Sequence, residues 1–89
     1  MFHKVTAVQP LPDFMLSVSF ETGERKIYDI KPLFSRWELF ESLQSTKGLF
    51  ACVQVDAGGY GISWNDDIDL SCGELYKNGR EEETMNNEQ

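Results

Sequence analysis

The sequence predicts an α+β domain in which a small antiparallel sheet of about five strands, two hairpins plus an N-terminal strand, packs with one central helix and a short C-terminal helix. Two patterns predict this class: the N-terminal third alternates apolar and polar residues with period two, and one central segment repeats apolar residues at helical spacing. The 89 residues are 40% hydrophobic and 12% aromatic, enough for one packed core. We expect one domain over residues 1–77 and an acidic, mobile C-terminal tail over residues 78–89.

The N-terminal strand and the first hairpin are read from alternation and turn residues. A first strand around Val5 is expected to end at Pro10, because proline donates no backbone hydrogen bond. Residues 14–20 and 25–30 then alternate as strands on either side of a turn that contains Gly23. These segments form a β-hairpin.

The register of this hairpin has two solutions. A two-residue Thr22-Gly23 turn places Val18 opposite Ile27, and one buried face then holds Leu16, Val18, Phe20 and Ile27. This turn requires a positive φ at Thr22, which is unfavourable. A three-residue loop with Gly23 in the left-handed conformation is the alternative, and it shifts the pairing by one residue.

A central helix is predicted after Pro32. Ser35 and Glu38 have the spacing of a capping box at its start, and Gly48 is a plausible stop. The apolar stripe that would cover one face of the sheet consists of Trp37, Leu39, Phe40 and Leu43.

The second half of the sequence predicts another hairpin and a short helix. Residues 49–55 and 60–64 are extended in pattern and are separated by a glycine-rich turn. Ser71 and Glu74 form a second capping-box spacing, which opens a helix that ends at Asn78-Gly79. The residues between Trp64 and this helix are interpreted as a polar turn.

Charge and apolar content restrict the partners and the location. Net charge is -7, with 8 basic and 15 acidic residues, which repels phosphate backbones and anionic membrane surfaces. We expect no direct nucleic-acid binding and no membrane association. No apolar run reaches the length of about 18 residues that a membrane helix needs, so a cytoplasmic protein is expected. Cys52 and Cys72 are expected to be buried free thiols.

The order of several short motifs resembles the DUF2442 family. These motifs are Val8-Gln9-Pro10-Leu11-Pro12-Asp13-Phe14, Phe20-Glu21-Thr22-Gly23-Glu24-Arg25, Tyr28-Asp29-Ile30, Val55-Asp56, Gly59-Tyr60, Trp64, Asp69-Leu70 and Leu75-Tyr76. The resemblance covers about residues 4–77. It implies a small bacterial α+β domain without an established activity, and members encoded beside a second small protein in an arrangement like that of a toxin and its antitoxin. The resemblance also implies that longer relatives carry a helix-turn-helix domain after this module. This chain ends twelve residues after Lys77, so we expect no DNA-reading helix and expect any regulatory role to work through a protein partner.

Candidate chemistry is sparse, and we expect no enzyme and no cofactor. His3 is the only histidine and is expected to be solvated near the terminus, so we expect no histidine-based acid–base pair, no Ser-His-Asp triad and no multi-histidine zinc site within one subunit. Clustered carboxylates at Asp66, Asp67 and Asp69 define the alternative function, a metal-binding domain or metal-dependent enzyme, since such oxygens ligate Mg²⁺ or Ca²⁺. Their spacing differs from that of a calcium loop and suits a polar turn ahead of a helix.

A protein-interaction or regulatory module is the function we expect, as the antitoxin-like half of a small two-protein bacterial system. One helix covers only one side of a sheet, so the second face needs a cover. In the two-residue-turn register Met15, Tyr28 and Ile30 line that face, and together with Trp37 they form the predicted surface for a protein partner or for self-association. The alternative is that the C-terminal helix covers this face through Leu70, Leu75 and Tyr76.

Overall fold

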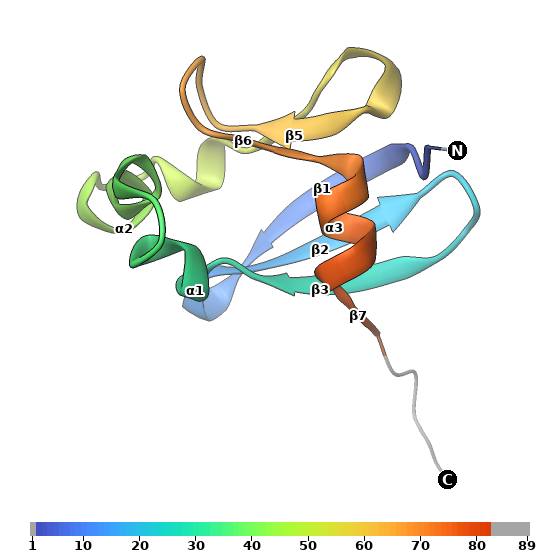
Figure 1. The fold of residues 1–89 in the computed structure, drawn as a ribbon, viewed down its shortest axis with the longest axis horizontal. Coiled ribbons are helices and arrows are strands. Elements are labelled where there is room, and N and C mark those ends of the chain that lie inside the picture. The colour runs from blue at the N-terminus through green and yellow to red at the C-terminus, as the bar shows by residue number, and fades with distance from the viewer. Residues whose placement is uncertain (1, 83–89) are drawn as a thin grey trace, which may run out of the picture.

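The computed structural model describes residues 2–82, which form two antiparallel sheets with three short α-helices between and beside them (Figure 1). The four-stranded sheet has the order β1 (Val5–Leu11), β2 (Met15–Phe20), β3 (Arg25–Asp29) and β7 (Arg80–Glu81). The three-stranded sheet has the order β4 (Gln54–Val55), β5 (Gly61–Ser63) and β6 (Asp69–Ser71). The helices are α1 (Lys31–Phe34), α2 (Ser42–Ser45) and α3 (Cys72–Asn78), and 3-10 turns lie at Pro12–Phe14, Glu38–Glu41, Phe50–Cys52 and Ala57–Gly59.

The predicted α+β class is confirmed, whereas the single sheet of about five strands is wrong. Two short strands lie outside the predicted strands. β6 lies where the sequence predicts only a polar turn before the last helix. β7 lies in the predicted acidic tail, where it pairs with Lys26 and Ile27 of β3. The remainder of the predicted tail, residues 83–89, lies outside the described residues. β1 also continues through Pro10, because an edge strand tolerates a missing donor.

The first hairpin adopts the three-residue loop. Gly23 has φ 95°, and the Phe20 N–H donates to the Glu24 carbonyl at 2.9 Å. Ser17 therefore lies opposite Ile27, and Leu16 opposite Tyr28, so the two-residue register is wrong. The reason is the glycine, which adopts a left-handed conformation that would be costly at Thr22.

This register turns Lys26, Tyr28 and Ile30 inward together with Leu16 and Val18. α3 crosses this inner face of the four-stranded sheet (Figure 1), and its Leu75 is fully buried there. The prediction that the C-terminal helix forms is confirmed, and its cap is made: the Glu74 N–H donates to Ser71 Oγ at 3.1 Å.

The predicted continuous central helix is broken into three pieces. Pro32 is accommodated in the first turn of α1, which ends before Trp37. Trp37 is extended, with φ -132° and ψ 124°, and a 3-10 turn then leads into α2. The Ser35–Glu38 capping box does not form, because Ser35 follows α1 and its hydroxyl faces back to the Pro32 carbonyl.

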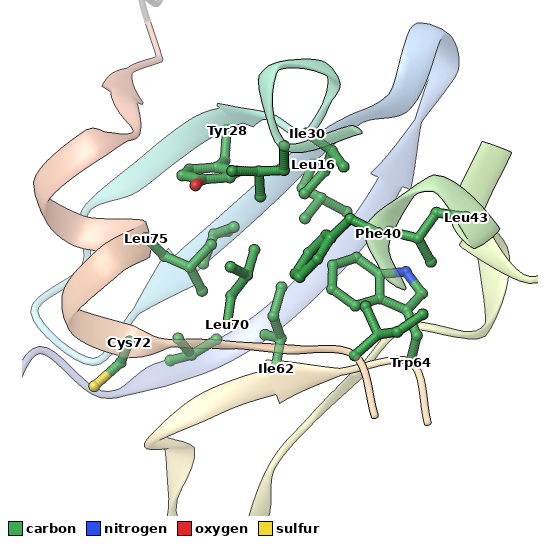
Figure 2. Packing of buried hydrophobic residues seen from close by; sticks show 14 of the residues in the cluster. Leu16, Tyr28, Ile30, Phe40, Leu43, Ile62, Trp64, Leu70, Cys72 and Leu75 are labelled. Carbon is green, nitrogen blue, oxygen red and sulfur yellow. The ribbon is translucent and has the colours of Figure 1, made fainter. Parts of the chain in front are cut away.

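The core lies between the inner face of the four-stranded sheet and a second layer made of α3, the three-stranded sheet and the helical segment 31–45. Figure 2 shows Leu16 and Tyr28 from the first layer meeting Leu75, Ile62 and Phe40 from the second. Burying side chains of both layers is the main favourable contribution to folding. The core consists of Val5, Leu16, Val18, Phe20, Tyr28, Ile30, Leu33, Phe40, Leu43, Ile62, Trp64, Ile68, Leu70, Cys72 and Leu75.

The second hairpin is confirmed in a shorter form than expected. β4 and β5 pair through Val55 and Ile62, while the preceding residues 50–52 form a 3-10 turn. Cys72 is buried as expected, but Cys52 lies exposed on that turn, which corrects the prediction of two buried thiols. Over residues 2–82, no helix has both the length and the apolar character needed to span a membrane.

Candidate functional site: an acidic groove beside Trp37

Two exposed apolar side chains share one groove on the surface. Trp37 is 48% exposed and Leu39 is 55% exposed. They line an open groove of about 400 Å³ whose remaining walls are Glu38, Phe40, Asp67 and Asp69. We refer to these six residues as the acidic groove.

The backbone around Trp37 holds the indole at the surface. The Trp37 N–H donates to the Leu33 carbonyl at the end of α1, and the Trp37 carbonyl accepts from the Phe40 N–H, each at 3.0 Å. The extended conformation at Trp37 separates the two helical turns, so its side chain does not join the stripe that enters the core. Leu39 likewise faces outward, whereas Phe40 and Leu43 are buried.

Aromatic rings support the groove from below. The ring centroids of Trp37 and Phe40 are 5.5 Å apart, and those of Phe40 and Trp64 are 6.1 Å apart in an edge arrangement. Trp64 is fixed in turn, because its indole N–H donates to the Phe50 carbonyl at 3.0 Å. Figure 2 shows Phe40 and Trp64 side by side in the core. The exposed indole therefore rests on a rigid, packed base.

The acidic wall comes from the loop between β5 and β6. Asn65 Oδ1 accepts hydrogen bonds from the backbone N–H groups of Asp67 and Ile68, both at 2.9 Å, which closes a tight turn. Ile68 is buried and anchors the loop in the core. Asp67 and Asp69, on either side of Ile68, consequently reach the groove.

Carboxylates from two separate segments of the chain thus flank an apolar floor. Glu38 belongs to the 3-10 turn, while Asp67 and Asp69 belong to the loop and to β6. One cation lies close by, since the Arg36 guanidinium is 5.6 Å from the centre of the Trp37 ring. Three carboxylates against one guanidinium leave the groove negative, in line with the net charge of -7.

The predicted interaction surface of Met15, Tyr28, Ile30 and Trp37 is not brought together. Tyr28 and Ile30 are 4% and 0% exposed in the core, because the three-residue loop turns them inward. Met15 lies on the opposite face of the sheet, where the Lys31 ammonium is 3.5 Å from its sulfur. Trp37 alone is exposed as expected, at the acidic groove.

The predicted metal ligands also separate. No group of three or more His, Cys, Asp or Glu side chains within residues 2–82 is placed to hold a metal ion. Asp67 and Asp69 line the acidic groove, and Asp66 is not among its walls. The loop is held by the Asn65 side chain and by the buried Ile68.

A second hollow, of about 260 Å³, lies where β3 meets α3. Tyr28 Oη donates to Glu74 Oε2 at 2.7 Å, and Asn78 Nδ2 donates to the same oxygen at 2.9 Å. Burial and the Glu74 carboxylate raise the pKa of Tyr28 above its usual range, so the phenol remains a donor. The sequence pattern does not predict the Tyr28–Glu74 pair, since nothing local links residues 46 positions apart.

The fold and the groove define a small α+β domain with one acidic, aromatic surface site. The chain belongs to the family described as "Protein of unknown function (DUF2442)", whose model matches residues 5–81. The predicted resemblance is thereby confirmed. No curated protein and no solved structure matches the chain.

Proposed function

We propose that this domain is a non-enzymatic protein-interaction module that binds a protein partner at the acidic groove. A single observation supports it most directly: Trp37 and Leu39 are about half exposed side by side in one groove on a packed aromatic base. Leaving these two side chains in water gives up hydrophobic free energy that a partner would recover.

The composition of the groove favours a protein rather than a small substrate. Tryptophan is enriched among the residues that dominate binding energy at protein interfaces, and the rim around such residues is commonly polar. Glu38, Asp67 and Asp69 provide this polar rim. The groove is open and contains no nucleophile paired with a base, which fits binding better than catalysis.

An antitoxin-like role in a small two-protein bacterial system of the cytoplasm is the biological form of this proposal. Its support is the paired gene arrangement that the family resemblance implies, together with a net charge that disfavours direct contact with nucleic acid. No observation on the described residues favours the metal-dependent alternative, so we do not propose it.

The test is affinity capture of the tagged full chain from a lysate of its source, with two variants. Trp37→Ala removes the exposed indole of the groove, and Tyr60→Ala removes an aromatic ring that is equally exposed, at 48%, outside it. We expect one protein to be recovered with the wild type and with Tyr60→Ala, and to be lost with Trp37→Ala.

The captured protein is then produced separately and titrated against the wild-type chain by calorimetry. A saturable one-to-one complex that Trp37→Ala weakens by about 30-fold or more supports the proposal, since such interface residues cost about 2 kcal/mol or more when truncated. Capture of no protein, or equal loss with both variants, contradicts it.

A further inference from the structure

We infer that the acidic groove recognises a partner segment that presents an apolar side chain beside an arginine. This inference rests on the proposed function and specifies the chemistry of the partner. It follows from the way in which apolar and acidic side chains are arranged around the same small volume.

The apolar half of the partner is indicated by the floor of the groove. Trp37 and Leu39 offer apolar surface to the groove, while Phe40 beneath them is only 6% exposed. An aliphatic side chain seated against the indole and Leu39 would remove apolar surface from water on both molecules. A purely polar or charged segment would gain nothing from this floor.

The charged half of the partner segment is indicated by the acidic walls of the groove. Glu38 approaches from one element, and Asp67 and Asp69 approach from another, so a cation in the groove would have carboxylates on two sides. An acidic or phosphorylated segment would meet these three carboxylates and a chain of net charge -7, which repels it.

Arginine fits this site better than lysine. Its planar guanidinium pairs with carboxylates through two parallel hydrogen bonds and also stacks on an indole. The domain already places one guanidinium near this indole, because the Arg36 guanidinium carbon lies 5.6 Å from the centre of the Trp37 ring, within cation–π range. Arg36 is a neighbouring cation, but it leaves the three carboxylates in excess.

The experiment uses three acetylated, amidated peptides of the form Gly-Ser-Leu-X-Ser-Gly, in which X is Arg, Gln or Glu. Each is titrated into the ¹⁵N-labelled full chain and followed by amide and indole N–H signals. The two tryptophans provide an internal comparison: Trp37 is half exposed, whereas the Trp64 N–H is hydrogen-bonded to the Phe50 carbonyl in the interior.

We expect the Arg peptide to shift the Trp37 indole signal and the amides of Asp67 and Asp69 while Trp64 stays in place. The Gln peptide should bind about threefold to tenfold more weakly, as expected for loss of one or two partly exposed ion pairs, and the Glu peptide more weakly still. Raising the salt concentration should reduce the preference for Arg.

Charge-matched variants distinguish a local effect from the net charge. Asp67→Asn with Asp69→Asn removes two wall carboxylates and should abolish the preference for Arg over Gln. Glu21→Gln with Glu81→Gln removes two exposed carboxylates outside the groove and should preserve it. Equal loss in both double variants would overturn the inference.

Failure of the inference is distinct from failure of the proposed function. If no peptide shifts Trp37, or all three shift it equally, the inference is wrong, even where partner capture depends on Trp37. If the Arg peptide binds selectively at Trp37 but capture does not depend on that residue, the inference is supported and the proposed docking of a protein is contradicted.

Discussion

The phenol of Tyr28 donates a 2.7 Å hydrogen bond to the carboxylate of Glu74 and thereby ties the centre of β3 to the first turns of α3. Asn78, one turn further along α3, donates to the same oxygen at 2.9 Å. Tyr28 is 4% exposed, and its raised pKa keeps the proton on the phenol. The pair therefore stabilises the packing of the helix on the sheet.

Tyr28→Phe should lower the free energy of unfolding by about 1–2 kcal/mol, because a largely buried hydrogen bond to a carboxylate is lost while the ring remains. Urea denaturation followed by circular dichroism measures this change. Tyr60→Phe is the control at a half-exposed ring and should change stability by less than about 0.5 kcal/mol. Similar effects of the two variants would mean that the Tyr28–Glu74 bond does not stabilise the fold.

Lys26 is the buried charged residue of the core, 9% exposed, and it contacts one residue of α3 twice. Its ammonium donates to the Tyr76 carbonyl at 2.6 Å and lies 3.9 Å from the centre of the Tyr76 ring. The carbonyl belongs to the last turn of the helix, where carbonyls lack helical partners.

Lys26→Met keeps the apolar stem and removes the charge, so it should cost about 1.5–3 kcal/mol of unfolding free energy. Guanidinium denaturation of the two proteins gives this difference. Lys77→Met, at an exposed position of the same helix, should cost less than about 1 kcal/mol. A Lys26 variant as stable as the Lys77 variant would show that water replaces the ammonium as the donor to the Tyr76 carbonyl.

Sequence alone predicted the elements that depend on local chemistry. The cap at Ser71 needs only a hydroxyl and the N–H three residues later, and both are present. The sequence allows two turns, and hence two registers, for the first hairpin, and the left-handed conformation of Gly23 selects the three-residue loop. The prediction of one continuous central helix is wrong. The apolar residues have helical spacing, but Trp37 is extended, and Phe40 packs against Trp64 from a separate 3-10 turn.

Individual residues of the acidic groove can be predicted from the sequence, but their assembly into one site cannot. The sequence predicts Trp37 as an interaction residue and offers Asp67 and Asp69 as candidate metal ligands, but about thirty residues separate Trp37 from the two carboxylates and only tertiary packing brings them together. The helical spacing predicts Leu39 in the buried stripe. Its exposure follows from the break at Trp37, for which the local sequence offered no signal.

Two glycines with nearly equal φ angles should differ sharply on substitution. Gly48 has φ 83° and no atom within 4 Å of an added Cβ, whereas Gly59 has φ 80° and an added Cβ would lie 2.6 Å from the Val5 carbonyl oxygen. Gly48→Ala should cost about 1–2 kcal/mol through its left-handed conformation. Gly59→Ala should cost about 1–3 kcal/mol more, since β1 must move. Denaturation midpoints of both variants test this, and equal losses would show that the turn shifts away from β1 freely.

Glu24 is expected to make the stability of the fold depend on pH in the acidic range. Its carboxylate accepts from Tyr76 Oη at 2.9 and 3.1 Å and from the Thr22 hydroxyl at 2.9 Å, and these bonds, the Tyr76 bond foremost, lower the pKa of Glu24 below 4.5. A carboxyl group whose pKa is lower in the folded than in the unfolded state stabilises the fold above the unfolded pKa, and this contribution is lost as the pH falls through the folded value.

Thermal unfolding midpoints of the wild type and Glu24→Gln, measured from neutral pH down to about 3, test this. We expect Glu24→Gln to be less stable than the wild type at neutral pH. The two midpoints should converge as the pH falls below 4.5. In a Tyr76→Phe background, which lacks the principal donor, the difference at neutral pH should shrink and its pH dependence should flatten. A gap between the wild type and Glu24→Gln that stays constant across this range would mean that the Glu24 hydrogen bonds do not favour the ionised carboxylate.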